Sequence, residues 1–179
     1  MNQLLCYLEK HGILLCNQNP LLPSLEDIGC SWSDVVELID NHQLFYCKIF
    51  QKRTSYLSAE AYYLLKQVRT SKPLPPEAEQ IYSLLLDKPP VDTTFLKEVS
   101  HLSSKSYRQG FDFLLQNLSV TALANGKSLA PNWSTFLYGT AEAWEQTSPN
   151  RFCCDHARDR LWEIFSSTMP EKLFRSLIR

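Results

Sequence analysis

The feature that most constrains the fold is a cluster of prolines near the middle of the 179-residue chain. Pro73, Pro75 and Pro76 lie close together in the segment SKPLPPEAE, which spans residues 71–79. Because proline fixes φ and has no amide hydrogen, neither a continuous helix nor a central strand can pass through this segment. The sequence therefore predicts two compact halves that meet here.

The half before the prolines is expected to mix helices and strands. The stretch QLFYCKIF is rich in aromatic and β-branched residues, which favour a strand, and the turn QKR leads into a second strand. Ser58 is placed to cap the helix that follows, and Ser24 with Asp27 marks another helix start. The expected elements are helices at 3–11, 33–41 and 59–69, and strands at 13–15, 43–50 and 54–57.

The half after the prolines is expected to form three short helices followed by a two-stranded hairpin. Asn125-Gly126 is the dipeptide most typical of a two-residue hairpin turn, and Pro131 is expected to close the loop. Thr140 can cap a further helix. The expected elements are helices at 77–86, 92–101, 104–118 and 141–146, and strands at 119–124 and 133–138. This order is typical of a winged helix, whose third helix commonly lies in the major groove of DNA.

The third of these helices has an apolar face that predicts part of the core. Its apolar residues recur at helical spacing and include Phe111, Leu114 and Leu118. We expect them to face the apolar residues of the preceding helix, which are Phe95, Leu96 and Val99.

The last segment, 151–179, predicts a basic helical region whose apolar face includes Trp162 and Phe165. This face can pack on either half or pair two subunits as a homodimer. The sequence as a whole predicts an α+β fold, predominantly helical, with tandem winged-helix-like halves and short β-hairpin wings. The expected divisions are 1–72, 73–147 and 148–179.

Composition excludes several classes of protein. The chain has six cysteines but no Cys-x-x-Cys pair, and the cluster Cys153-Cys154-Asp155-His156 lacks a second pair of ligands, so no metal site is predicted. No nucleotide-binding or hydrolase motif occurs, and no cofactor is expected. The apolar runs are too short to cross a membrane, and the first residues do not resemble a signal peptide, so we expect a cytoplasmic protein without a membrane partner.

The formal net charge of −1 means that any nucleic-acid site must be a local patch. One segment of the first half gathers six cations against the single acid Glu60. They are Lys48, Lys52, Arg53, Lys66, Arg69 and Lys72. Lysine and arginine in such a patch favour contact with phosphates, and the alternative is an ordinary solvated surface. The aromatic residues between them, such as Tyr56 and Tyr62, are more typical of a core than of a base-stacking surface.

The polar face of the 104–118 helix is a second candidate for contact with DNA. Ser104, Lys105, Arg108, Gln109 and Asp112 can reach base edges, with arginine suited to guanine and glutamine to adenine. In the expected hairpin loop only Lys127 can reach a phosphate. A winged helix can also serve as a protein-interaction module, and this alternative stays open.

Three stretches of the sequence resemble the AlkZ-related winged-helix proteins. The first is YCKIFQKRTSYLSAEAYYLLKQVR at 46–69, which matches through Lys48, Phe50, Lys52, Arg53, Tyr56, Ser58 and Arg69. The opening YLEKHGILLCNQNPLLPSLEDI at 7–28 is similar to the N-terminal stretch of that family. The segments 111–123 and 133–145 are similar to its winged-helix part, through Phe111, Leu118, Trp133, Ser134, Tyr138, Glu142 and Trp144.

This resemblance implies a DNA-associated winged-helix architecture, like that of the wider group that includes DNA glycosylases acting on interstrand crosslinks. The glycosylases use a Gln-x-Gln or Gln-x-Asp motif. No glutamine of this chain is followed two residues later by glutamine or aspartate. The family's Asp-Pro-Trp-like stretch is also reduced here, to CSWSD at 30–34. We therefore expect a non-catalytic protein that binds duplex DNA, related to transcription or repair. The alternatives are a protein-interaction or dimerisation module and a glycosylase-like enzyme.

Overall fold

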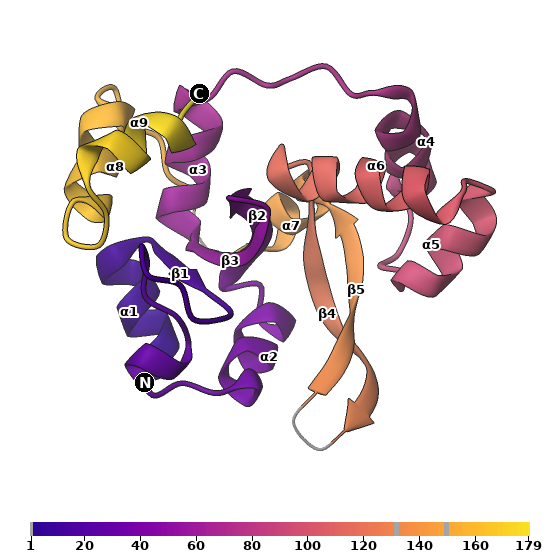
Figure 1. Ribbon diagram of the computed structural model, residues 1–179, viewed down its shortest axis with the longest axis horizontal. Helices are drawn as coiled ribbons and strands as arrows, with labels where there is room; N and C mark the ends of the chain where they lie inside the picture. Colours follow the sequence, from indigo (N-terminus) through magenta and orange to yellow (C-terminus); the bar gives the residue numbers. More distant parts are fainter. Residues whose placement is uncertain (1, 131–132, 149–150) are drawn as a thin grey trace.

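The computed structural model describes residues 2–130, 133–148 and 151–179. In these residues the chain combines short helices with two small antiparallel sheets (Figure 1). This arrangement confirms the predicted α+β class with a large helical content.

The first half contains a three-stranded sheet flanked by helices. Gly12, with a φ of 76°, ends the first helix, and the Ser58 hydroxyl accepts a hydrogen bond from the Ala61 amide to cap the last one, as predicted. The elements are α1 (Gln3–His11), β1 (Ile13–Leu15), α2 (Trp32–Asp40), β2 (Leu44–Phe50), β3 (Arg53–Ser58) and α3 (Ala59–Val68). The sheet order is β1-β3-β2.

Two details of this half differ from the prediction. The helix start expected at Ser24 is a single 3₁₀ turn, Glu26–Ile28, although the Asp27 carboxylate does accept hydrogen bonds from the Ser24 amide and hydroxyl. The turn between β2 and β3 has two residues rather than three. Gln51 and Lys52 occupy it with φ of 47° and 59°, the positive values of a type I′ turn.

The second half repeats the pattern of helices followed by a hairpin. Thr140 caps its last helix through a hydrogen bond from the Ala143 amide, as predicted. The elements are α4 (Pro76–Leu85), α5 (Thr93–Ser100), α6 (Ser104–Gln116), β4 (Val120–Ala130), β5 (Trp133–Thr140) and α7 (Ala141–Thr147). Between α4 and α5, Val91 exchanges two backbone hydrogen bonds of 3.0 and 2.8 Å with Tyr138 of β5.

The prediction of a hairpin turn at Asn125-Gly126 was wrong. Both residues lie inside β4, and Asn125 is opposite Phe136. The backbone amide of Asn125 donates to the Asp40 carboxylate at 2.6 Å, a contact that a local turn rule cannot predict. A Cβ on Gly126 would lie 2.5 Å from Oγ1 of Thr135, so this glycine permits close strand approach rather than a turn. Pro131, expected to close the loop, lies outside the described residues.

The two halves share one order of elements and one pattern of pairing. In the first half α1 is followed by β1, the 3₁₀ turn, α2, a hairpin and the capped α3, and in the second half α4 is followed by the extended Val91, α5, α6, a hairpin and the capped α7. Leu14 of β1 pairs with Tyr56, and Val91 pairs with Tyr138 in the same way. The sequence repeats at this point as well, with YLSAEAY at 56–62 and YGTAEAW at 138–144.

Each hairpin lies against a helix of the opposite half (Figure 1). The β2–β3 hairpin contacts α6, where Lys48 forms an ion pair with Asp112. The β4–β5 hairpin contacts α2, where the indole of Trp32 donates to the Ser134 hydroxyl. Because each hairpin packs on a helix of the opposite half, we call the two hairpins exchanged.

The core consists of two clusters, and both draw residues from before and after the prolines. One cluster joins Tyr46 and Tyr56 to Leu114 of α6, and the other joins Phe45 and Tyr62 to Trp144 of α7. The C-terminal helices α8 (Ala157–Phe165) and α9 (Glu171–Leu177) extend the second cluster, with α8 packed along α3 (Figure 1). The expected divisions of the chain thus share a common interior.

The expected packing of α5 on α6 is only partly correct. Leu96 is fully buried in the same cluster as Leu114, but Phe95 is 50% exposed and Val99 is 38% exposed. Leu118 is buried in the second cluster, away from Phe111 in the first. The eight-residue α5 buries only Leu96 and Ser100, so the neighbouring Phe95 and Val99 point outward.

Candidate nucleic-acid interface

The outer face of α6 carries the polar residues that the sequence predicts for DNA contact. Ser104, Lys105, Arg108 and Gln109 are all exposed, whereas Tyr107 beside them is buried. Ser103 caps the helix by accepting a hydrogen bond from the Ser106 amide, which fixes where this face begins.

An open groove of about 620 Å³ runs along the first half of this face. Its cations are Lys105 and Arg108 from α6 and Lys97 from α5, and its lining includes one carboxylate, that of Asp112. The rings of Tyr107 and Phe111 also line it and stack with centroids 5.7 Å apart. Lys97 was not among the residues predicted from the sequence, because the preceding helix offered no basic pattern.

Lys48 reaches α6 from the hairpin of the other half. Its ammonium lies 2.6 Å from Oδ1 of Asp112, and the two side chains are 25% and 28% exposed. This lysine is therefore already paired with a carboxylate. Its charge offsets that of Asp112, the acid that lies between Arg108 and the end of α6.

Arg69 and Lys72 approach the other end of α6. Arg69 donates from Nη1 to the carbonyl oxygen of Gln116 at 3.1 Å, and its burial lowers the pKa of the guanidinium. The backbone of Lys72 exchanges hydrogen bonds with the Asn117 side chain, and the lysine is exposed. Positions 108, 112 and 116 lie one turn apart along α6, and cations occur at or near each of these turns. We call this set of cations the basic strip, and it comprises Lys105, Arg108, Lys48, Arg69 and Lys72.

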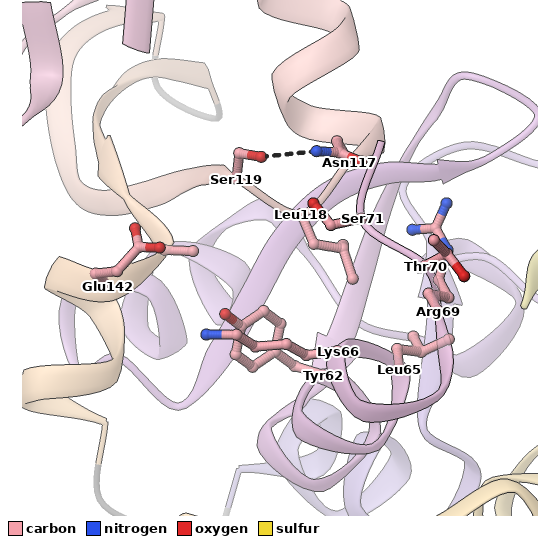
Figure 2. Close-up of a pocket in the computed structure, with 11 residues that line it drawn as sticks. Tyr62, Leu65, Lys66, Arg69, Thr70, Ser71, Asn117, Leu118, Ser119 and Glu142 are labelled. Carbon is pink, nitrogen blue, oxygen red and sulfur yellow. Dashed lines mark hydrogen bonds between the residues drawn. The ribbon is translucent and has the colours of Figure 1, made fainter. Parts of the chain in front are cut away.

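Lys66 lies outside the basic strip. Its ammonium pairs with Glu145, which also accepts a hydrogen bond from the Tyr62 hydroxyl. Figure 2 shows Lys66 running beside Tyr62 while the Arg69 guanidinium extends the other way. Lys66 and Arg69 both line a small cavity of about 130 Å³, but their charged groups point in different directions.

The remaining predicted residues lie on the two hairpins. Lys52 and Arg53 are exposed at the β2–β3 tip, and neither makes an ion pair within the described part of the chain. Lys127 is exposed in β4, where its amide donates to the Thr135 hydroxyl. That hairpin extends away from α6 and lies against α2, so Lys127 is not brought to the basic strip (Figure 1).

The helix of the first half that corresponds to α6 has the opposite charge. The charged positions of α2 are all acidic, and their carboxylates already have partners. Asp34 accepts from the Ser31 amide, Glu37 accepts from the side chain of Asn2, and Asp40 accepts from the Asn125 amide. The two similar halves therefore offer one basic helix and one acidic helix.

The described residues contain neither a cluster of metal ligands nor a helix that could cross a membrane. In residues 2–130, 133–148 and 151–179, no three His, Cys, Asp or Glu side chains gather as a metal site would require. Within the same residues, no helix has both the length and the apolar composition needed to span a membrane.

The fold is a mixed α+β arrangement of two helix-and-hairpin halves, with the cations of the basic strip along α6. A family model described as AlkZ related matches residues 1–178. The chain therefore belongs to the AlkZ-related family, as the resemblance of its sequence implied. No curated protein and no solved structure matches it.

Proposed function

We propose that this protein binds duplex DNA without catalysing a reaction on it, through tandem winged-helix-like halves. The order of helices and hairpin in each half, with an extended residue pairing to the hairpin, supports this architecture. In such a unit α6 holds the position of the third helix, which commonly enters the major groove.

The observation that carries the proposal is that cations of both halves lie along α6, from its exposed first turns to its C-terminal end. Arg69 and Lys72 come from the end of α3 and the linker, and Lys48 comes from the β2–β3 hairpin. Lys105 and Arg108 come from α6 itself. A strip of positive charge on a protein of net charge −1 suits the phosphates of a duplex, because neutralised phosphates release their counterions.

The test is a salt titration of binding to a random-sequence duplex. Each phosphate contact contributes roughly −0.9 to the slope of log K against log salt concentration. Replacing Lys105 and Arg108 together by alanine should make the slope shallower by about 1 to 2 units. Replacing Lys52 and Arg53 together by alanine tests the hairpin tip in the same way. Arg158→Ala with Lys172→Ala, at exposed positions of α8 and α9, is a control of equal charge.

Two results would overturn the proposal. One is a wild-type protein that shows no salt-dependent affinity for duplex DNA. The other is an equal loss of slope in the α6 double variant and in the α8–α9 control, because net charge alone would then account for the binding.

The absence of catalysis is tested separately. The proposal rests here on the missing Gln-x-Gln or Gln-x-Asp motif. Incubation with alkylated or crosslinked duplex should release no free base, as measured by chromatography of the soluble products. Release that depends on the protein would instead support the glycosylase-like alternative.

A protein-interaction module is the second candidate, and the exposure of Phe95 and Val99 on α5 favours it. The predicted homodimer through the C-terminal helices would have to rest on Trp162, which is half-buried against Phe174, since Phe165 is fully buried within one chain. An interaction module predicts association that depends on protein concentration, and light scattering of Phe95→Asp and Trp162→Asp variants would locate the surface.

A further inference from the structure

We infer that Asp112 reads a cytosine in the major groove and that Lys48 positions its carboxylate to do so. The inference rests on the proposed DNA binding and adds to it a base that the site should prefer. Asp112 is an acid among the cations of the basic strip, where a carboxylate would ordinarily repel phosphates.

Asp112 lies on the face of α6 that the proposal directs at DNA. It follows Arg108 by four residues, so the two side chains are neighbours on the helix surface. Both line the open groove of about 620 Å³. The Asp112 side chain is 28% exposed, which leaves part of the carboxylate accessible from that groove.

The ion pair with Lys48 uses only one oxygen of this carboxylate. The lysine ammonium contacts Oδ1 at 2.6 Å. Oδ2 has no hydrogen-bond partner among the residues that the structure describes. The lysine thus fixes the side chain and offsets its charge, while an acceptor stays available. Lys48 is contributed by the exchanged hairpin, so the readout depends on the association of both halves.

The chemistry of the major groove identifies the partner of this acceptor. Cytosine presents its N4 amino group as a donor there, and a carboxylate accepts from it. Arginine is suited to the O6 and N7 acceptors of guanine. Arg108 and Asp112, one turn apart, therefore favour a guanine and a cytosine close together over A·T pairs.

The experiment selects bound sequences from a library of duplexes with a randomised central stretch, followed by sequencing. Wild-type protein should enrich cytosine at one position by roughly fivefold or more. Asparagine pairs with adenine N6 and N7, so Asp112→Asn should move the preference at that position from cytosine to adenine and leave the others unchanged. Asp159→Asn, at an exposed position of α8, is the matched control and should select the same sequences as wild type.

A second variant tests the role of Lys48. Lys48→Met leaves the Asp112 carboxylate without its cation, so affinity for every duplex should fall several-fold at low salt. The cytosine enrichment should also weaken, because the side chain is no longer held. Thermal melting of each variant separates these effects from a loss of folded protein.

Several outcomes would overturn the inference. If wild type and Asp112→Asn bind duplex DNA and select identical sequences, then Asp112 contacts no base and only joins the halves. If Lys48→Met is folded and retains full affinity and enrichment, then Lys48 does not position the carboxylate. If wild type binds no duplex at all, the proposed function fails and the inference fails with it.

Discussion

Two glycines show how one residue type can serve two different needs. Gly12 and Gly29 both have positive φ, 76° and 68°, which favours glycine. A Cβ on Gly12 would lie 2.4 Å from the ring of Phe165 and 2.6 Å from Ile164, whereas a Cβ on Gly29 would meet nothing within 4 Å. Gly12 is therefore also the site where α8 approaches the start of β1.

Alanine at these two positions should separate backbone strain from packing. Gly29→Ala should lower the free energy of unfolding by about 1 kcal/mol, the strain of a left-handed residue. Gly12→Ala should lower it by roughly 2 to 5 kcal/mol, because Phe165 must also move. Urea denaturation of both variants measures the difference, and equal losses would show that α8 does not pack against Gly12 as described.

The cysteines should differ sharply in reactivity. Cys47 is fully buried, and burial raises the pKa of its thiol to about 12 because the thiolate would be desolvated. Cys153 is exposed. Since the thiolate is the reactive form, iodoacetamide at pH 8 should label Cys153 in the folded protein and Cys47 only after unfolding. Mass spectrometry of peptides gives both rates, and comparable labelling in the folded state would contradict the buried position of Cys47.

At the scale of elements, the β2–β3 hairpin is held by a turn of unfavourable sequence. Gln51 and Lys52 both adopt positive φ, which asparagine and glycine tolerate far better. Replacing the pair by Asn-Gly should raise the free energy of unfolding by about 1 kcal/mol. The Lys52→Ala variant removes the same charge but keeps the strain, so in thermal melting it should not gain stability. An Asn-Gly variant no more stable than Lys52→Ala would contradict the type I′ geometry.

Element prediction from the sequence succeeded where the signal was local. Ser58, Thr140 and Gly12 set helix ends through bonds within a few residues, and these ends were predicted correctly. Asn125-Gly126 was misread because the turn rule is local, whereas β4 continues through contacts with Asp40 and Thr135. Phe95 and Val99 were expected in the core because of their apolar spacing, but both are exposed. Apolar spacing identifies the apolar side of a helix, but it does not show which of those residues contact a neighbouring element.

At the scale of the whole molecule, the candidate site could be predicted only in part. Net charge along the sequence identified a basic segment, and helical spacing identified the face of α6. Neither could show that Lys48 pairs with Asp112 or that Lys66 pairs with Glu145, since each contact joins residues of different halves that are far apart in the sequence. The repeated motifs at 56–62 and 138–144 were the available signal of the duplication itself.

The exchanged hairpins also predict how the protein unfolds. Both core clusters contain residues from each side of the prolines, so neither half can bury its apolar surface alone. The full chain should therefore unfold in one transition, with the same midpoint by far-ultraviolet circular dichroism and by tryptophan fluorescence. Leu8 on α1 and Leu114 on α6 are fully buried in one cluster. Leu8→Ala and Leu114→Ala should each lower the free energy of this single unfolding transition by roughly 2 to 5 kcal/mol.

A fragment of residues 1–72 provides the decisive comparison. It retains β2 and β3 but lacks β5 and α7, so Phe45 and Tyr46 lose the partners Trp144 and Tyr138. We expect this fragment to show no cooperative thermal transition. A fragment that melts cooperatively, or a full chain whose two probes give different midpoints, would show that the halves are independent. The distinction bears on the basic strip directly, because Lys48 and Asp112 are held together only when both halves fold as one unit.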